Sequence, residues 1–112
     1  MLKANTEDYI RELKLLAHHI EEQHGHVLKN LQEPLLLTVE LNLASKAHFL
    51  ISSEGINYLS EPLAIRDQIR VSYKDLLRLV EKPSRILRYI LEGRVVISGN
   101  YQRVLSTLQK LF

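Results

Sequence analysis

Apolar residues recur at helical spacing in the first quarter of the chain. Asn5 and Thr6 can each act as an N-cap, and Gly25 is a natural residue to end a helix. The spacing therefore predicts a helix between these positions, followed by a connection that reaches Pro34. The apolar stripe of this helix comprises Tyr9, Ile10, Leu13, Leu16, Ala17 and Ile20.

The pattern then changes to the period of two that is typical of a half-buried strand. Leucine and valine alternate with polar residues from Leu37 to Leu43, so one face of this strand is expected to be core. Glu54 and Gly55 predict a hairpin turn, and the short connections predict antiparallel pairing. Further strands are expected over residues 48–52, 56–59 and 68–72.

A helical period returns after the fourth strand. Ser72 and Asp75 resemble a capping box, and Pro83 ends the helix that they begin. Ser84 is the expected N-cap of a second helix, which Gly93 closes. The side chains expected inside are Leu76, Leu77, Leu79, Val80, Ile86, Leu87, Tyr89, Ile90 and Leu91.

A fifth strand and a last helix complete the pattern. Residues 94–98 alternate, and Gly99 and Asn100 open a helix whose apolar stripe is long. The order of elements, without a repeat or linker, predicts one α+β domain over residues 1–112, with an N-terminal helical segment at 1–33 and the sheet and its helices at 34–112. The last stripe comprises Tyr101, Val104, Leu105, Leu108, Leu111 and Phe112.

Composition excludes several classes of protein. The chain is 46% hydrophobic and 25% charged, which is the balance of a globular domain. It has no cysteine, which excludes disulfides, thiolate metal sites and a cysteine nucleophile. It has no apolar run long enough to span a bilayer, and residues 1–9 lack the apolar stretch of a secretory signal. We expect a cytoplasmic protein.

Basic residues are concentrated in the second half, where residues 57–112 hold ten Lys and Arg against five Asp and Glu. Such asymmetry is typical of a nucleic-acid or anionic-lipid surface, and also of solvated helix faces. Only Tyr73 and Tyr89 interleave with the basic residues, and no RNA- or DNA-binding signature accompanies them, so nucleic acid is not the expected partner. The basic run comprises Arg66, Arg70, Lys74, Arg78, Lys82, Arg85 and Arg88.

No catalytic or metal-binding constellation stands out. The histidines at 18, 19, 24 and 26 lie near Glu21 and Glu22, but the HExxH motif is absent, and GxSxG is absent as well. His48 is the one histidine elsewhere, in an expected strand, and the four glycines are scattered. We therefore expect no enzyme activity, no cofactor and no metal. Twenty-two leucines suit a filled core or an apolar pocket, and periodicity does not distinguish the two.

The C-terminal part carries an ordered series of motifs. IRVSYKDLLRLV at residues 69–80 gives a strand and a helix, YILEG at 89–93 closes a second helix, and RVVISGN at 94–100 precedes the last helix. This series resembles the sterol carrier protein 2 family over residues 35–112, and most of all its bacterial ubiquinone-biosynthesis accessory proteins. The family often opens its second helix with Asn-Pro, whereas Pro83 comes earlier here.

The resemblance implies a twisted, mostly antiparallel five-stranded sheet with helices over one face, and an apolar tunnel that binds sterols, fatty acyl chains or isoprenoids. Together with the lack of a catalytic constellation, it leads us to expect non-catalytic lipid carriage. We expect the last helix, residues 100–112, to act as a lid, because a terminal amphipathic helix can open without unravelling the sheet. Candidate wall residues, taken from the strand and helix periods, are Phe49, Ile51, Ile69, Val71, Leu76, Val80, Ile86, Tyr89, Ile90, Val95, Ile97, Val104, Leu105 and Leu108.

Two further interpretations stay open. The apolar groove could instead receive a partner protein or a second copy, for example within a ubiquinone-biosynthesis assembly. An enzyme acting on a lipid head group would need an ionisable residue in the pocket, for which only His48, Glu40 and the tyrosines are available. The residues expected to approach an anionic membrane are Arg78, Lys82, Arg85 and Arg88.

Overall fold

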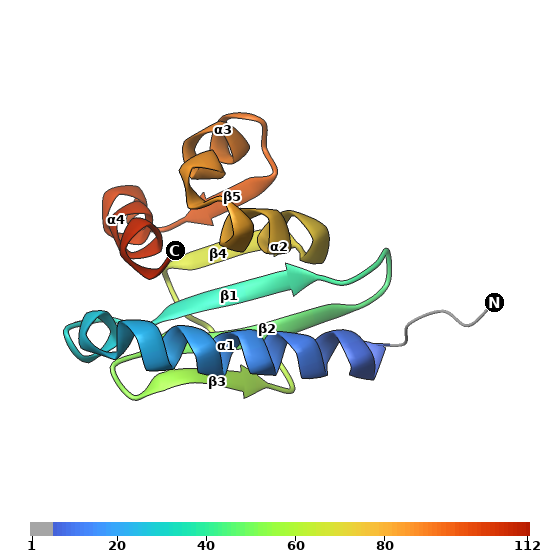
Figure 1. Ribbon diagram of the computed structural model, residues 1–112, viewed down its shortest axis with the longest axis horizontal. Coiled ribbons are helices and arrows are strands. Elements are labelled where there is room, and N and C mark those ends of the chain that lie inside the picture. The colour runs from blue at the N-terminus through green and yellow to red at the C-terminus, as the bar shows by residue number, and fades with distance from the viewer. Residues whose placement is uncertain (1–5) are drawn as a thin grey trace.

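The computed structural model describes residues 6–112 and has a five-stranded sheet with four α-helices and a short 3-10 helix (Figure 1). The predicted order of elements is confirmed, whereas the alternative N-cap Asn5 lies outside the described residues. The elements are α1 (Thr6–Lys29), β1 (Leu35–Glu40), β2 (Lys46–Ser52), β3 (Gly55–Leu59), β4 (Gln68–Ser72), α2 (Tyr73–Glu81), η1 (Pro83–Arg85), α3 (Ile86–Leu91), β5 (Val95–Ser98) and α4 (Tyr101–Leu111).

The strand order is β3-β2-β1-β4-β5, and the pairing is antiparallel except between β1 and β4. The mostly antiparallel sheet is confirmed, and the parallel pairing of β1 with β4 corrects the antiparallel pairing that the short connections predicted for the first four strands. Residues 60–67 connect the edge strand β3 to β4 on the far side of β2 and β1, and β4 then runs parallel to β1. Connection length constrains strands that follow each other in the chain, whereas β2 and β3 come between β1 and β4, so the short loops did not determine how these two strands pair.

The pleat divides the sheet into an inner and an outer face. The helices cover the inner face, with α1 over β2 and β3, α2 over β1 and β4, and α3 and α4 beside β5 (Figure 1). The outer face carries polar side chains such as Thr38, His48 and Arg70. The inner face is apolar because every second residue of each strand is apolar. Its side chains, related by the strand register, are Leu35, Leu37, Val39, Ala47, Phe49, Ile51, Ile56, Tyr58, Ile69, Val71, Val95 and Ile97.

Helix α1 is longer than the sequence predicted. The backbone leaves helical geometry at His24 (φ −126°, ψ 27°) and then resumes the helix to Lys29, so Gly25 does not end it. The second part is held by packing, since Leu28 is buried in the core and Val27 packs against it. Tertiary contact thus overrides the local signal of the glycine.

The first strand is shorter than predicted. It ends at Glu40, and the Asn42 side chain then accepts hydrogen bonds from the backbone N–H groups of Ala44 and Ser45, at 2.9 and 2.8 Å. This turn points Leu43 into solvent, so the expectation that Leu43 is core was wrong. An Asn side chain that bonds to the backbone two or three residues ahead competes with continuation of a strand.

The capping predictions were right at two helices and wrong at the third. Ser72 accepts a hydrogen bond from the N–H of Asp75 at 3.1 Å, and Asn100 accepts one from the N–H of Arg103 at 3.2 Å. Ser84 makes no cap, because it lies inside η1 and α3 begins only at Ile86.

Four apolar side chains that were expected inside lie in solvent instead. Leu77, Leu87, Leu91 and Tyr101 are 42%, 50%, 88% and 46% exposed. Each lies on the side of its helix that faces away from the sheet. The apolar stripe on each of these helices is therefore wider than the part of the helix surface that is buried against the core.

Candidate functional site

The space between the inner face of the sheet and the helices is the candidate site. It contains two small voids, here called the inner cavities, with volumes of about 30 and 20 Å³. Each has room for about one water molecule, whereas a ligand pocket usually spans about 300 Å³ or more. The interior is therefore close-packed in this conformation. Leu37, Ile51, Leu76 and Phe112 border both inner cavities.

The Phe112 ring connects the interior to the surface. Besides the two inner cavities, it borders an outer groove of about 330 Å³ between α2, η1 and α3 on one side and α4 on the other. The ring is partly buried and packs against the core. Leu79, Ile86 and Leu108 also border both the groove and the smaller inner cavity, whereas Phe112 borders all three spaces. The groove is lined by Leu79, Pro83, Ser84, Ile86, Leu87, Leu108, Gln109 and Phe112.

The predicted wall residues fall into two groups. The first group lines an inner cavity or the outer groove and comprises Phe49, Ile51, Ile69, Val71, Leu76, Ile86, Val95 and Leu108. The second group borders neither and comprises Val80, Tyr89, Ile90, Ile97, Val104 and Leu105. Tyr89 and Val104 are buried in the core, and the others are partly buried. Whether either group contacts a ligand stays a prediction.

Sequence reasoning missed one wall of this interior. Helix α1 contributes Leu13, Leu16, Ala17 and Ile20 to the larger inner cavity. Their helical stripe was visible in the sequence, but the family resemblance covered only the chain from residue 35 onward. Leu37, Ile56, Leu79, Leu111 and Phe112 were also missed as lining residues.

All side chains that border the inner cavities are apolar. His48 and Glu40 lie on the outer face instead, where the Nδ1 atom of His48 is 3.0 Å from the Oγ1 atom of Thr38. Burial, together with the charge of Lys46, lowers the pKa of His48 below its ordinary value. His48 and Glu40 are therefore separated from the interior by the sheet. Of the tyrosines named with them for head-group chemistry, Tyr58 lies on the inner face and Tyr89 is buried, but neither borders an inner cavity.

The histidine cluster of α1 lies on the surface. His18 and Glu22 are one helical turn apart, and Nε2 of His18 lies 2.8 Å from a carboxylate oxygen of Glu22. Within residues 6–112, no three His, Asp or Glu side chains gather in a way that could hold a metal ion.

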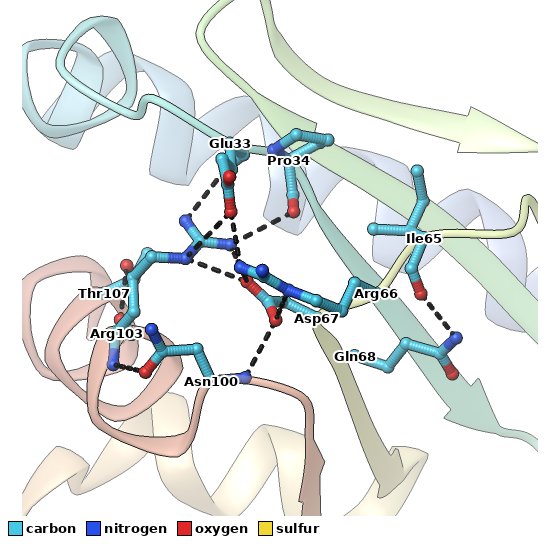
Figure 2. A network of polar contacts seen from close by, with 9 residues as sticks. All are labelled: Glu33, Pro34, Ile65, Arg66, Asp67, Gln68, Asn100, Arg103 and Thr107. Carbon is cyan, nitrogen blue, oxygen red and sulfur yellow. Dashed lines mark hydrogen bonds and ion pairs between the residues drawn. The ribbon is translucent and has the colours of Figure 1, made fainter.

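A buried carboxylate fixes the start of α4 against the sheet (Figure 2). Asp67, only 1% exposed, accepts hydrogen bonds from the backbone N–H of Asn100 at 2.9 Å, from Nε of Arg66 at 3.0 Å and from Nε of Arg103 at 2.8 Å. Nη1 of Arg103 also donates to the carbonyl of Glu33, ahead of β1, at 3.0 Å. The network therefore ties together three parts of the chain that are distant in sequence.

The electrostatics of this network favour the charged carboxylate. The Arg66 hydrogen bond is the largest cause that holds the pKa of Asp67 far below its usual range, and the bonds from Asn100 and Arg103 act in the same direction against the effect of burial. Gly99 must approach this carboxylate closely, with φ +91°, and a Cβ at this position would lie 2.7 Å from the carbonyl oxygen of Arg66. The anchored end of α4 is thus its N-terminus, and Phe112 follows its opposite end.

The four basic residues named for membrane approach lie on one stretch of surface. Arg78 belongs to α2 and Lys82 directly precedes η1. Arg85 is the last residue of η1, and Arg88 belongs to α3. The Arg85 guanidinium donates to the carbonyl of Arg78 at 3.4 Å, and the Arg88 guanidinium lies 5.6 Å from the centre of the Tyr89 ring. This stretch adjoins the outer groove, which Pro83, within the same stretch, helps to line. In the described part of the chain, no helix is long and apolar enough to cross a membrane.

Comparison with known proteins gives matches among solved structures. No family model matches the sequence, and no curated protein matches it significantly. Sterol carrier protein 2 like 2 from Aedes aegypti matches with a TM-score of 0.70 at 13% identity, over 89% of this chain and 97% of that chain. A palmitated form of this Aedes aegypti protein matches with a TM-score of 0.67 at 10% identity, over 96% and 95%.

A ubiquinone synthesis protein, UbiJ-SCP2, matches with a TM-score of 0.53 at 16% identity, over 88% of this chain and 89% of that chain. The chain therefore has the sterol carrier protein 2 fold. This result confirms the fold that the motifs of residues 69–108 predicted.

Proposed function

We propose that this protein binds a hydrophobic lipid between the inner face of its sheet and its helices, and carries it without chemical change. The observation that carries the proposal is a pair of inner cavities bordered by apolar side chains alone, with Phe112 bordering both of them and the surface groove. A chain of the same fold exists in a palmitated form, which supports a fatty acyl chain as one ligand class. Sterols and isoprenoids, including quinone precursors, are further candidates.

Binding on this proposal requires the interior to open. Each CH₂ group of a buried chain contributes about 0.8 kcal/mol, and this gain offsets the separation of side chains that now fill the space. With no ionisable group beside the inner cavities, orientation by polar contacts is weak and the site accepts chains of varied structure.

The moving part on this proposal is the end of α4 and Phe112. The Asp67 network holds the start of α4, whereas Phe112, after its other end, borders the groove and both inner cavities. Deleting residues 106–112 would test a lid, but it would also remove Leu108 and Leu111, which are 3% and 2% exposed in the core. A change at Phe112 alone is therefore the sharper test.

The experiment that tests lipid binding fills the larger inner cavity. Ala17 lines this cavity on α1, so an Ala17→Leu variant adds apolar volume where the ligand would lie. We expect weaker binding of palmitate in a fluorescent fatty-acid displacement titration, with a retained circular dichroism spectrum. The matched control is Leu15→Ala, which changes an exposed side chain of the same helix. Equal palmitate binding by Ala17→Leu and the control would contradict a ligand in this space.

A second candidate is an accessory module that binds a partner protein or a second copy through the outer groove. The match to a ubiquinone synthesis protein is compatible with this candidate. Concentration-dependent size without extractable lipid would support it over carriage. The absence of enzyme activity and of nucleic-acid binding, and a cytoplasmic location, stay predictions from the sequence.

A further inference from the structure

Two leucines of α3 are directed into solvent beside the outer groove. Leu87 and Leu91 are 50% and 88% exposed, and they lie one turn apart on the same side of the helix. The opposite side of α3 is occupied by Ile86 and Tyr89, which are buried in the core. Burial of α3 against the core therefore leaves an apolar ridge on the surface.

Basic residues are frequent in the stretch of chain that leads to and includes this ridge. Residues 73–91 hold five Lys and Arg against two Asp and Glu. One of the two carboxylates, Asp75, is already paired, with Arg94 at 3.2 Å and Arg78 at 3.8 Å. Apolar side chains within a basic rim are the combination that partitions into the head-group region of an anionic bilayer.

The location of the ridge connects it to the candidate site. Leu87 lines the outer groove together with Pro83, Ser84 and Phe112. Figure 1 shows α3 at the edge of the molecule, beyond β5 and away from α1. A flat surface that contacts α3 would therefore lie next to the opening that Phe112 closes.

We propose that Leu87 and Leu91, with Arg78, Lys82, Arg85 and Arg88, form a docking surface for an anionic lipid bilayer, and that docking places the outer groove against the lipid. The functional role of this docking surface rests on the proposed lipid carriage, but vesicle binding can be measured independently of carriage. The positive charge of the rim favours an anionic membrane over an uncharged apolar partner.

The test is flotation with vesicles of phosphatidylcholine, with or without phosphatidylglycerol. We expect the protein to float only with the anionic vesicles, and added salt to weaken this binding. The double variant Leu87→Gln, Leu91→Gln should lose most of the binding. Arg85→Gln with Arg88→Gln should weaken it by about thirtyfold, since each basic residue near the surface contributes about fivefold.

Matched controls change the same residue types elsewhere. Leu15 and Leu43 are exposed leucines on α1 and in the turn after β1, so Leu15→Gln with Leu43→Gln should leave vesicle binding unchanged. Arg11→Gln with Lys29→Gln removes two charges from α1 and should weaken binding much less than the rim variant. Equal loss in both leucine pairs, or equal flotation with uncharged vesicles, would overturn the docking surface.

Two further readouts separate this inference from its alternatives. Self-association that the Leu87→Gln, Leu91→Gln variant abolishes, without any vesicle binding, would assign the ridge to a second copy and overturn the proposal. Palmitate titration without vesicles should give equal affinity for wild type and a Leu91→Gln single variant, because Leu91 lines neither the inner cavities nor the outer groove. Failure of wild type to bind palmitate, with vesicle binding as expected, would contradict carriage and leave the docking surface standing.

Discussion

Replacing Phe112 by alanine tests whether the interior can open for a ligand. The ring borders both inner cavities and the outer groove, so we expect its removal to connect them. Truncating a fully buried phenylalanine costs about 3–5 kcal/mol of folding free energy, and a partly buried one about half as much. We therefore expect Phe112→Ala to lower the free energy of unfolding by about 2 kcal/mol in the ligand-free protein.

A ligand should reverse this loss. If wild type must displace the ring to admit a lipid, the variant avoids that cost and binds palmitate more tightly, by up to about thirtyfold for 2 kcal/mol. At palmitate concentrations about 100 times the dissociation constant, binding adds about 2.7 kcal/mol to stability. The difference in stability between variant and wild type should therefore shrink when palmitate is present.

Urea unfolding followed by circular dichroism, with and without palmitate, measures these quantities. Leu105→Ala serves as the control, because Leu105 packs against the core without lining the inner cavities or the outer groove. This control should lose stability without gaining affinity. A Phe112→Ala variant that is destabilised and shows no greater stabilisation by palmitate than wild type would refute the reasoning.

The Asp67 network gives two more predictions. Asp67→Asn removes the charge that Arg66 and Arg103 bond to, so we expect a loss of about 2 kcal/mol in urea unfolding at neutral pH. The folded-state pKa of Asp67 is lowered, so the unfolded chain takes up a proton at this carboxylate before the folded protein does. The stability that the charged carboxylate contributes is therefore complete above about pH 4 and is lost as the pH falls below it. The Asp67→Asn variant should lose less unfolding free energy than wild type over that acidic range. Gly99→Ala places a Cβ against the carbonyl oxygen of Arg66 in a left-handed conformation and should lower the unfolding free energy by about 3 kcal/mol, whereas an unchanged melting temperature would contradict the close approach.

Local signals in the sequence predicted local structure well. Ser72 and Asn100 cap their helices as expected, because a cap depends on a few neighbouring residues. The predictions at Gly25 and Leu43 were wrong because the structure there depends on contacts beyond the local pattern. The packing of Leu28 extends α1 past the glycine, and the Asn42 turn ends β1 before the leucine.

The candidate site was harder to predict than the fold. Periodicity identified apolar faces, but it did not show that Leu87 and Leu91 would lie outside or that the interior would be nearly filled. Asp67 is one of many charged residues in the sequence. Its burial depends on Arg103 and Gly99, which are more than thirty residues away, so no local pattern indicated it.

Native mass spectrometry of the purified protein, followed by organic extraction and lipid analysis, tests the central claim most directly. We expect a mass above that of the 112-residue chain, and an acyl, sterol or isoprenoid lipid in the extract. Added palmitate should give the same kind of complex when the protein is first stripped of lipid. A bare mass that neither palmitate nor an isoprenoid alcohol shifts would mean that the interior is a permanently filled core, and it would contradict lipid carriage.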